Sequence, residues 1–476
     1  MHAWIANETQ TADFGDERLD RRFAVVLESL SEKPSLSIPA ACGGLAETTA
    51  AYRFFANERV DAAKVLQPHR DATVERVREQ KVVLVAQDTT EADLTRAVEK
   101  VGGPLNDEAR WGLFAHTQLV LTPERVPLGV LRAEIWSRDP EEFAKTQQEK
   151  RRERKNKPIE EKESYRWLQG YRHACQLAEQ APDTTVVSLS DSEGDIYECF
   201  AEASAGADKR AEWIVRACQD RALAEGTGSL IQQLMCTRSL GTLRIDVSKR
   251  DAATGDQRKR KQARPARKAK VTVRATSVLL RPPARAGTKL LPVRVNAILV
   301  REEKPPAASE PLEWLLLTSL PIETFADVCQ VIEYYCCRWE IEIYFRVLKS
   351  GCNIEELQLE TEARVQACLA VYMIVAWRVL FLLMMGRQCP KLSCDAVLSE
   401  AEWKSVYTMV ANKPAPIQPP LLQGMVAMIA ELGGYLGRKH DGPPGPQTMW
   451  IGIQRMRDFA AAWSAFGPGR RVTRDV

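Results

Sequence analysis

The sequence lacks the arrangements of cysteine and histidine that bind zinc. It has 12 cysteines and 5 histidines in 476 residues, but no Cys-x-x-Cys element occurs and the histidines do not cluster. A structural zinc site is therefore not expected. We interpret the cysteines as reduced, mostly buried thiols, which are typical of cytoplasmic proteins.

The sequence also has little that resembles a targeting or membrane segment. The first 22 residues contain no apolar stretch of the signal-peptide type. One long hydrophobic run spans residues 367–386, but Arg378 lies near its middle, where a charge costs about 2.5–3.5 kcal/mol on insertion. We therefore predict a buried helix in which Arg378 is paired or reaches the surface. We expect a cytoplasmic protein that does not bind membranes.

Charge is nearly balanced overall but is concentrated locally. The formal net charge is +3, yet residues 249–270 contain ten lysines and arginines against two aspartates. Such a run binds the DNA backbone by releasing counterions and does not read base sequence. A solvated loop is the alternative. The candidate DNA-binding residues of this run are Lys259, Arg260, Lys261, Arg264 and Arg267.

Hydrophobic periodicity predicts an α/β protein of several domains. Residues 1–75 have helical patterns, and Arg18, Arg22 and Arg53 give them basic points, which fit either DNA contact or simple solvation. Next come three strands, a helix, a strand, a helix, a strand, a β-rich insertion at about 222–310, and a last strand and helix. The chain after residue 352 is mostly helical in pattern.

Three carboxylates have positions that suit a metal site. Asp88 is predicted to end the first strand and Asp191 the fourth. If these strands are neighbours in one sheet, both side chains emerge at one edge, where a packed helix could add Glu342. Taken singly, each aspartate is equally well explained as a turn former. Together the three oxygen ligands suit Mg²⁺ or Mn²⁺, and two such ions support phosphodiester chemistry.

The segment YYCCRWEIEIYFRVLKSG at 334–351 is predicted to form one amphipathic helix. At 100° per residue, its polar side chains fall within an arc of about 80°. An exposed ladder of ion pairs is one interpretation of this face. The other is a metal-binding carboxylate beside groups that bind phosphate. The face consists of Tyr335, Arg338, Glu342, Arg346 and Lys349.

These motifs resemble the DDE transposases, and more narrowly the bacterial insertion sequence four family, which includes the transposon five transposase. The signature is Y-x2-R-x3-E-x6-K at Tyr335, Arg338, Glu342 and Lys349. The aspartate contexts are QDTT at 87–90 and SDSEGDIY at 190–197, in which Ser192 stands where an arginine is common. EWLLLTSLP (313–321), KES-x-x-W (162–167) and RPARKA (264–269) also match.

The resemblance implies roles for individual residues. Asp88, Asp191 and Glu342 would bind two Mg²⁺ ions, for which Mn²⁺ can substitute. Tyr335, Arg338 and Lys349 would bind the phosphate backbone near a transposon end. Trp314 would fill the gap left by a flipped base, and Trp339 would stack on that base. Core packing is the alternative for both tryptophans.

The resemblance also implies the domain organisation and the activity. We expect a helical DNA-binding domain at 1–75, a ribonuclease-H-like catalytic core with the β-rich insertion at 76–385, and a helical dimerisation domain at 386–476. The implied protein is a homodimeric, Mg²⁺-dependent transposase. It would bind terminal inverted repeats, cut DNA through a hairpin, and insert the ends into target DNA. A regulator that does not cut and a basic, metal-dependent host nuclease are the alternatives.

Overall fold

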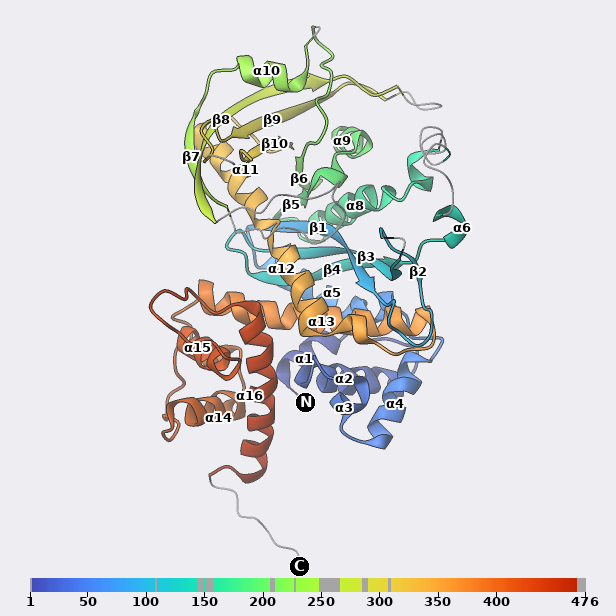
Figure 1. Ribbon diagram of the computed structural model, residues 1–476, viewed down its shortest axis with the longest axis vertical. Helices are drawn as coiled ribbons and strands as arrows, with labels where there is room; N and C mark the ends of the chain where they lie inside the picture. The colour runs from blue at the N-terminus through green and yellow to red at the C-terminus, as the bar shows by residue number, and fades with distance from the viewer. Residues whose placement is uncertain are drawn as a thin grey trace, which may run out of the picture. The chain divides into compact units, whose positions relative to one another are not determined.

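A computed structural model describes residues 2–107, 109–143, 149, 157–205, 210–226, 228–247, 266–284, 290–306 and 310–468. The chain divides into two compact units. The first contains Met1–Thr146 and Cys337–Val476, and the second contains Gln147–Cys336. Both units combine helices with strands, as Figure 1 shows, and the predicted α/β class is confirmed.

The first unit begins with helices, as predicted. They are α1 (Ala3–Thr9), α2 (Glu17–Glu32), α3 (Ile38–Cys42), α4 (Leu45–Phe55) and α5 (Ala62–Arg78). In α2, Phe23, Val26, Leu27 and Leu30 are buried because the spacing i, i+3, i+4, i+7 places them on one face. The Asp16 carboxylate caps this helix by accepting the backbone N–H of Arg18.

The strands of the first unit form an antiparallel arrangement in which β3 lies between β1 and β4. The strands are β1 (Val82–Asp93), β2 (Gly103–Pro104), β3 (Trp111–Leu121) and β4 (Pro127–Trp136). The short helix α6 (Pro140–Phe143) follows β4. All residues of β3 after Trp111 are buried, so this strand is the centre of the local core. The predicted first three strands are confirmed, and β2 is an additional short strand.

The first unit resumes after the second and ends in helices. They are α12 (Glu340–Arg346), the π-helix η4 (Val347–Gly351), the 3₁₀ turn η5 (Ile354–Glu356), α13 (Glu362–Gln388), the 3₁₀ turn η6 (Cys394–Ala396), α14 (Glu400–Ala411), α15 (Leu422–Leu432) and α16 (Pro446–Phe466). Helices α14, α15 and α16 pack on one another (Figure 1).

Helix α13 is the predicted hydrophobic run, and it is buried. By length and composition it could cross a membrane, but 89% of its most apolar window is buried within the protein. It packs on α5, β4 and α15. Arg378 is also buried, donates to the Val397 carbonyl at 2.6 Å, and lies over the rings of Trp4 and Phe381. The prediction of a buried helix with a paired arginine is confirmed, and burial lowers the pKa of Arg378 to about 10.

The second unit alternates strands and helices. Its elements are the 3₁₀ turn η1 (Ile159–Glu161), α8 (Tyr165–Gln180), β5 (Thr185–Ser190), the 3₁₀ turn η2 (Ser192–Gly194), α9 (Tyr197–Ser204), β6 (Glu212–Arg216), α10 (Leu230–Cys236), β7 (Gly241–Val247), β8 (Arg267–Leu280), β9 (Val293–Arg301), β10 (Glu313–Thr318) and α11 (Phe325–Cys337). The predicted order of strands and helices is confirmed.

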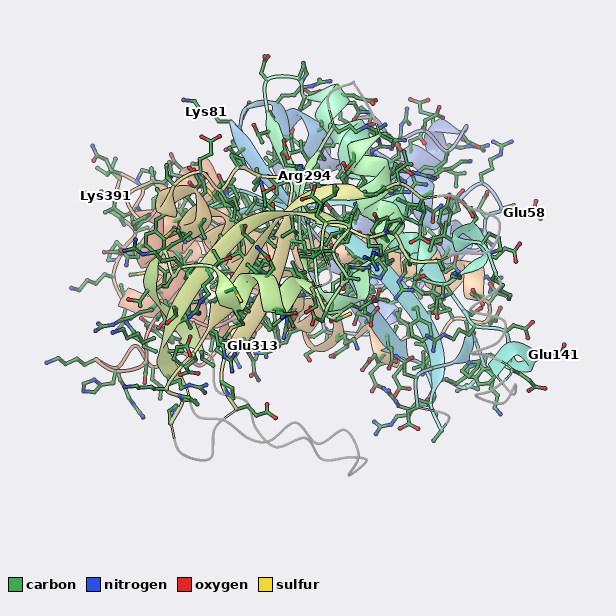
Figure 2. The ribbon with its side chains drawn as sticks, turned by 90° about the horizontal axis from the view of Figure 1, so that it is seen from above. Glu58, Lys81, Glu141, Arg294, Glu313 and Lys391 are labelled. Carbon is green, nitrogen blue, oxygen red and sulfur yellow. The ribbon has the colours of Figure 1, made fainter. Side chains whose placement is uncertain are left out.

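The sheet of the second unit is mixed. β5 and β6 are parallel, and the neighbours β6–β10, β10–β9, β9–β8 and β8–β7 are antiparallel. β7, β8 and β9 make up the predicted β-rich insertion, which also contains helix α10. Charged side chains project from the strands of this sheet, including the labelled Arg294 on β9 and Glu313 on β10 (Figure 2).

Candidate active site

Asp88 lies within β1 and not at its end. The strand runs to Asp93, and Asp88 is paired with Thr117 of β3. The prediction that the first strand stops at Asp88 is therefore wrong. The burial of β1 does change there, because Val83 to Gln87 are buried and Asp88 is only partly covered. Loss of hydrophobicity marks where the strand leaves the core, while backbone pairing with β3 continues for five more residues.

The segment 334–351 is not one helix, so that prediction is also wrong. Helix α11 ends at Cys337, α12 begins at Glu340, and a π-helix follows from Val347 to Gly351. Tight i→i+3 bonds close the break, as the Ile341 N–H donates to the Arg338 carbonyl. Neither glycine nor proline marks this break, so the pattern of side chains gives no sign of it.

Arg338 joins two of the predicted catalytic carboxylates. Its Nη1 lies 3.1 Å from Asp88 Oδ2 and its Nη2 lies 2.9 Å from Glu342 Oε1. The Arg338 side chain is 5% exposed, while those of Asp88 and Glu342 are 19% and 47% exposed. The guanidinium therefore holds the two carboxylates at one place, and both keep surface open to solvent.

Trp339 supports this guanidinium. The Arg338 guanidinium carbon lies 4.7 Å from the centre of the Trp339 ring, within the range of a cation–π contact. The indole is 38% exposed. A partly exposed aromatic ring beside a carboxylate pair is suited to stacking on a ligand, so the predicted stacking role of Trp339 has an accessible ring to act through.

The structure distinguishes Glu342 from Glu340, its neighbour on α12. Glu340 is 4% exposed, and its Oε1 is 3.4 Å from Arg125 Nη1. Burial raises the pKa of Glu340, and Arg125 opposes this shift. Glu340 is thus a buried partner of the turn between β3 and β4. Glu342 is the carboxylate of this helix that a ligand can reach.

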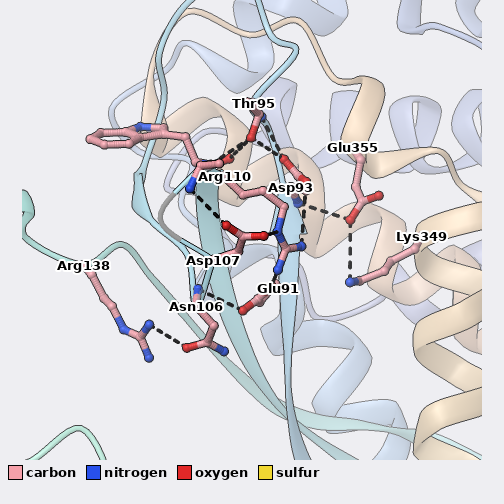
Figure 3. A network of polar contacts seen from close by, with 11 residues as sticks. Glu91, Asp93, Thr95, Asn106, Asp107, Arg110, Arg138, Lys349 and Glu355 are labelled. Atoms are coloured by element: carbon pink, nitrogen blue, oxygen red, sulfur yellow. Dashed lines mark hydrogen bonds and ion pairs between the residues drawn. The ribbon is translucent and has the colours of Figure 1, made fainter. Parts of the chain in front are cut away.

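Lys349 lies in the π-helix that follows α12. The Cys352 N–H donates to the Val347 carbonyl at 3.0 Å, which is the i→i+5 bond of a π-helix. Segments of this kind occur frequently at functional sites. The Lys349 ammonium is partly exposed and lies 3.6 Å from Glu355 Oε1 (Figure 3).

Asp191 directly follows β5 in the second unit, as predicted. Its Oδ1 accepts the Glu193 N–H at 2.8 Å and so caps the turn η2. The turn is tight, because a Cβ at Gly194 would lie 2.5 Å from the Ser190 Cβ. Glu193 is held by Arg166 at 2.8 Å. This local capping satisfies one carboxylate oxygen of Asp191 and fixes its side chain.

Trp314 and Tyr335 contact each other in the core of the second unit. Their ring centres are 5.6 Å apart with an interplanar angle of 68°, an edge-to-face contact. Trp314 is 6% exposed and Tyr335 is 1% exposed. The packing of Trp314 matches the alternative that the sequence left open, whereas the burial of Tyr335 does not fit an exposed polar face. The contacts of both residues with DNA stay predictions.

The N-terminal basic residues lie on helices. Arg18 is on α2 with 89% of its side chain exposed, beside Asp16 at 2.9 Å. Arg22 is partly exposed on the same helix, and Arg53 is exposed on α4. All three retain surface through which DNA contact could occur.

The basic run of the insertion is only partly described. Lys259, Arg260, Lys261 and Arg264 lie outside the described residues. Arg267 is described, and its Nη2 lies 2.7 Å from Glu302 Oε2 with both side chains largely buried. This guanidinium is committed to a structural ion pair, so we leave it out of the DNA-binding proposal.

An exposed basic pair on the insertion was missed in the sequence. Arg244 of β7 is paired directly with Lys270 of β8, and Lys268 lies on the same face two residues away. All three are exposed. Like charges placed opposite each other repel, and a bound phosphate would relieve this repulsion. Lys268 and Lys270, two residues apart at the start of β8, were the available signal.

The predicted metal ligands fit a hard divalent ion in chemical type. Asp88 and Glu342 offer carboxylate oxygens, the ligands that Mg²⁺ and Mn²⁺ prefer, and they already share one positive group, Arg338. Across the described ranges, no group of three His, Cys, Asp or Glu side chains is arranged to hold a metal. The contribution of Asp191, which belongs to the second unit, stays a prediction.

Three family models match the chain. One described as a transposase DNA-binding domain matches residues 1–60. A second, described as a transposase DDE domain, matches residues 141–377. A third, described as the transposase Tn5 dimerisation domain, matches residues 374–465. The DDE match includes Asp191 and Glu342 and begins after Asp88.

The chain therefore belongs to the DDE transposases, which implies a ribonuclease-H-like core and dependence on a divalent metal. The DNA-binding and dimerisation matches make the assignment more specific. It is a Tn5-like transposase, consistent with the insertion sequence four family, that binds DNA and forms dimers.

Proposed function

We propose that this transposase binds the terminal inverted repeats of a transposable element and moves the element by cut-and-paste transposition. The observation that carries the proposal is the bridge from Asp88 through Arg338 to Glu342. It brings two of the three predicted acidic residues together across a long separation in sequence. Arg338 is the cation between them, and in this proposal it also binds a DNA phosphate.

Asp88, Asp191 and Glu342 would together hold two Mg²⁺ ions, for which Mn²⁺ can substitute. When bound, the ions supply positive charge that activates the attacking oxygen and stabilises the leaving oxygen. Arg338 contributes permanent charge and orients Asp88 and Glu342. Lys349 contacts the backbone phosphate near the cleavage point as a charge-assisted donor.

The DNA reaction proceeds in four steps under this proposal. Water attacks the first strand, and the released 3′-OH attacks the opposite strand to close a hairpin. A second water opens the hairpin, and the new 3′-OH joins target DNA. While the strand is bent, Trp339 stacks on the flipped base and Trp314 fills the gap that the base leaves.

The helices that follow α13 supply the dimer contact of the synaptic complex in this proposal, in which two subunits bring two transposon ends together. Arg18, Arg22 and Arg53 contact the repeat from the N-terminal helices, and Arg244 with Lys270 contacts the backbone from the insertion. The protein acts in the cytoplasm on the nucleoid and not at a membrane.

Cleavage and binding measured on one labelled inverted repeat test this function. The wild type is expected to bind the repeat with Mg²⁺, Mn²⁺, Ca²⁺ or EDTA, and to cut only with Mg²⁺ or Mn²⁺. An unrelated duplex of equal length is the control. Cutting in EDTA would contradict the metal-dependent reaction.

The same assay separates the alternatives. A regulator would bind and pair the repeats but leave them intact with every metal. A host nuclease would cut the repeat and the unrelated duplex equally. The access that Asp88 and Glu342 keep to solvent favours an enzyme that cuts DNA over the regulator, since purely structural carboxylates would not need it.

A further inference from the structure

Glu355 connects Lys349 to the end of β1. Its Oε1 accepts the backbone N–H of Asp93 at 3.2 Å, and the same oxygen lies 3.6 Å from Lys349 Nζ (Figure 3). Asp93 is the last residue of β1. One carboxylate oxygen therefore contacts both the lysine of the signature and the strand that carries Asp88.

The two segments that Glu355 connects are themselves fixed. Gln358 Oε1 accepts the Val98 N–H at 3.0 Å, which is a second bond between the same loop and the chain after β1. Arg110 holds Glu91 at 2.7 Å and lies 3.8 Å from Asp93 (Figure 3). Because both sides are anchored, the contact from Glu355 can set where the ammonium of Lys349 lies.

The free energy expected from the Lys349–Glu355 ion pair is too small for a main role in stability. The side chains of Lys349 and Glu355 are 30% and 36% exposed, and exposed pairs contribute about 0–1 kcal/mol. A carboxylate beside a phosphate-binding lysine also lowers the attraction for DNA. A residue that adds little stability and opposes binding needs another explanation.

We propose that Glu355 is a positioning residue that fixes the ammonium of Lys349 relative to β1 and Asp88. This inference rests on the proposed function, in which Lys349 contacts a DNA phosphate. Lysine has a flexible four-carbon side chain. Glu355 restricts that freedom, so that the phosphate bound by Lys349 is held at a defined place when DNA is cut.

Glu355→Gln is expected to change DNA binding and the rate of cutting in opposite directions. Loss of one negative charge strengthens binding to any duplex. Loss of the ion pair frees Lys349 and slows cutting of DNA that is already bound. The neighbouring Glu356 is exposed and has the same charge, so Glu356→Gln is a matched control for the charge effect alone.

The experiment measures duplex affinity and the rate of cleavage at saturating protein on the labelled repeat. Both variants are expected to bind an unrelated duplex slightly more tightly. Glu355→Gln is expected to cut about tenfold more slowly, and Glu356→Gln to cut at the wild-type rate. Glu355→Asp, which keeps the charge on a shorter side chain, is expected to cut at an intermediate rate.

The decisive comparison introduces Glu355→Gln into a protein that already carries Lys349→Ala. Glu355→Gln is expected to cause no further slowing once Lys349 is absent. Equal slowing with and without Lys349, or equal rates for Glu355→Gln and Glu356→Gln, would overturn the inference. If Glu355→Gln does not fold, the comparison of Glu355→Asp with the wild type decides in the same way. Failure of the wild type to cut would instead reject the proposed function.

Discussion

Two arginine–carboxylate pairs in this protein have similar geometry but different surroundings. Arg267 and Glu302 lie 2.7 Å apart in the insertion, with 10% and 3% of their side chains exposed. Arg338 and Glu342 lie 2.9 Å apart, and Glu342 is 47% exposed. The Glu302 carboxylate of the first pair is used within the protein, since it also accepts the Leu312 N–H. The second leaves a carboxylate open to a ligand, so burial and not distance separates a structural pair from a candidate catalytic one.

The largest expected effect is on cleavage. Asp88→Ala and Asp191→Ala each remove a proposed metal ligand, and a loss of about 4 kcal/mol of transition-state stabilisation corresponds to a thousandfold slower reaction. Binding to the repeat should persist, because fewer negative charges face the phosphates. Rates on the labelled repeat and gel-shift affinities measure the two effects. A folded variant that cuts at nearly the wild-type rate would remove that residue from the site.

The second-largest effect is expected on stability and its pH dependence, at the buried pair of Arg267 and Glu302. The Arg267 hydrogen bond lowers the pKa of Glu302, although burial opposes the shift. Glu302→Gln removes the negative charge opposite the largely buried Arg267, which then keeps the Glu310 carbonyl as a neutral partner. The loss of that charge should cost about 3 kcal/mol at pH 7. A lowered folded-state pKa gives stability above the unfolded value of about 4.3 that is lost as the pH falls through the folded value.

Urea unfolding of the wild type and Glu302→Gln from pH 7 to pH 3 measures this difference. The gap between the two proteins should be full above about pH 5 and should narrow below about pH 4. A gap that stays constant over the whole range would show that the charge of Glu302 is not responsible for it.

A smaller effect is expected at Trp314. The indole is buried against Tyr335, so Trp314→Ala would leave a cavity and destabilise the fold by about 3–5 kcal/mol. A slower reaction of that variant could then result from lost stability instead of lost base flipping. Trp314→Phe keeps an aromatic ring. It should nick the first strand normally and form the hairpin about tenfold more slowly, since only the hairpin needs a sharply bent strand. Denaturing gels resolve the two products, and equal losses in both steps would contradict base flipping.

The smallest effect is expected at Arg18. Its side chain is exposed, so Arg18→Ala should change the free energy of unfolding by less than about 0.5 kcal/mol. One lost phosphate contact should reduce the salt dependence of binding to the repeat by about one unit of slope. Arg78→Ala, outside the range of the DNA-binding match, is the control. Identical slopes for both variants would remove Arg18 from the interface.

Much of the fold could be predicted because hydrophobic pattern follows burial. The run 367–386 became α13, and the short β-branched runs became strands β1, β3 and β5. Backbone bonding was harder to predict. The end of β1 depends on pairing with β3, and the π-helix at 347–351 depends on a shifted hydrogen bond from Cys352. Neither leaves a mark in side-chain polarity.

The site was predictable in part for a related reason. The spacing of the signature predicted Arg338 and Glu342, and the QDTT context after a hydrophobic run predicted Asp88. The structure brings these three residues together. The interpretation of Arg267 had no such support, because its partner Glu302 is 35 residues away and belongs to no motif. The structure groups N-terminal and C-terminal segments in one compact unit, which a reading along the sequence does not predict. The three domain boundaries stay predictions.

The packing of the C-terminal helices decides how the dimer proposal can be tested. Removal of residues from about 440 onward would delete α16, in which Met449, Ile453 and Met456 are buried and Arg457 is paired with Glu402. Such a truncation would expose the core of the first unit. Loss of the paired-end complex would then not distinguish a lost interface from a damaged fold, so exposed side chains such as Ile417 are better targets.

Cleavage rate and unfolding free energy, measured together for Glu342→Ala and Glu302→Gln, test the central claim most directly. Glu342→Ala should keep its stability within about 1 kcal/mol and cut about a thousandfold more slowly. Glu302→Gln should lose about 3 kcal/mol of stability, yet cut at nearly the wild-type rate at a temperature where it stays folded. If Glu342→Ala instead cuts normally while folded, the bridge from Asp88 through Arg338 to Glu342 is not the catalytic site.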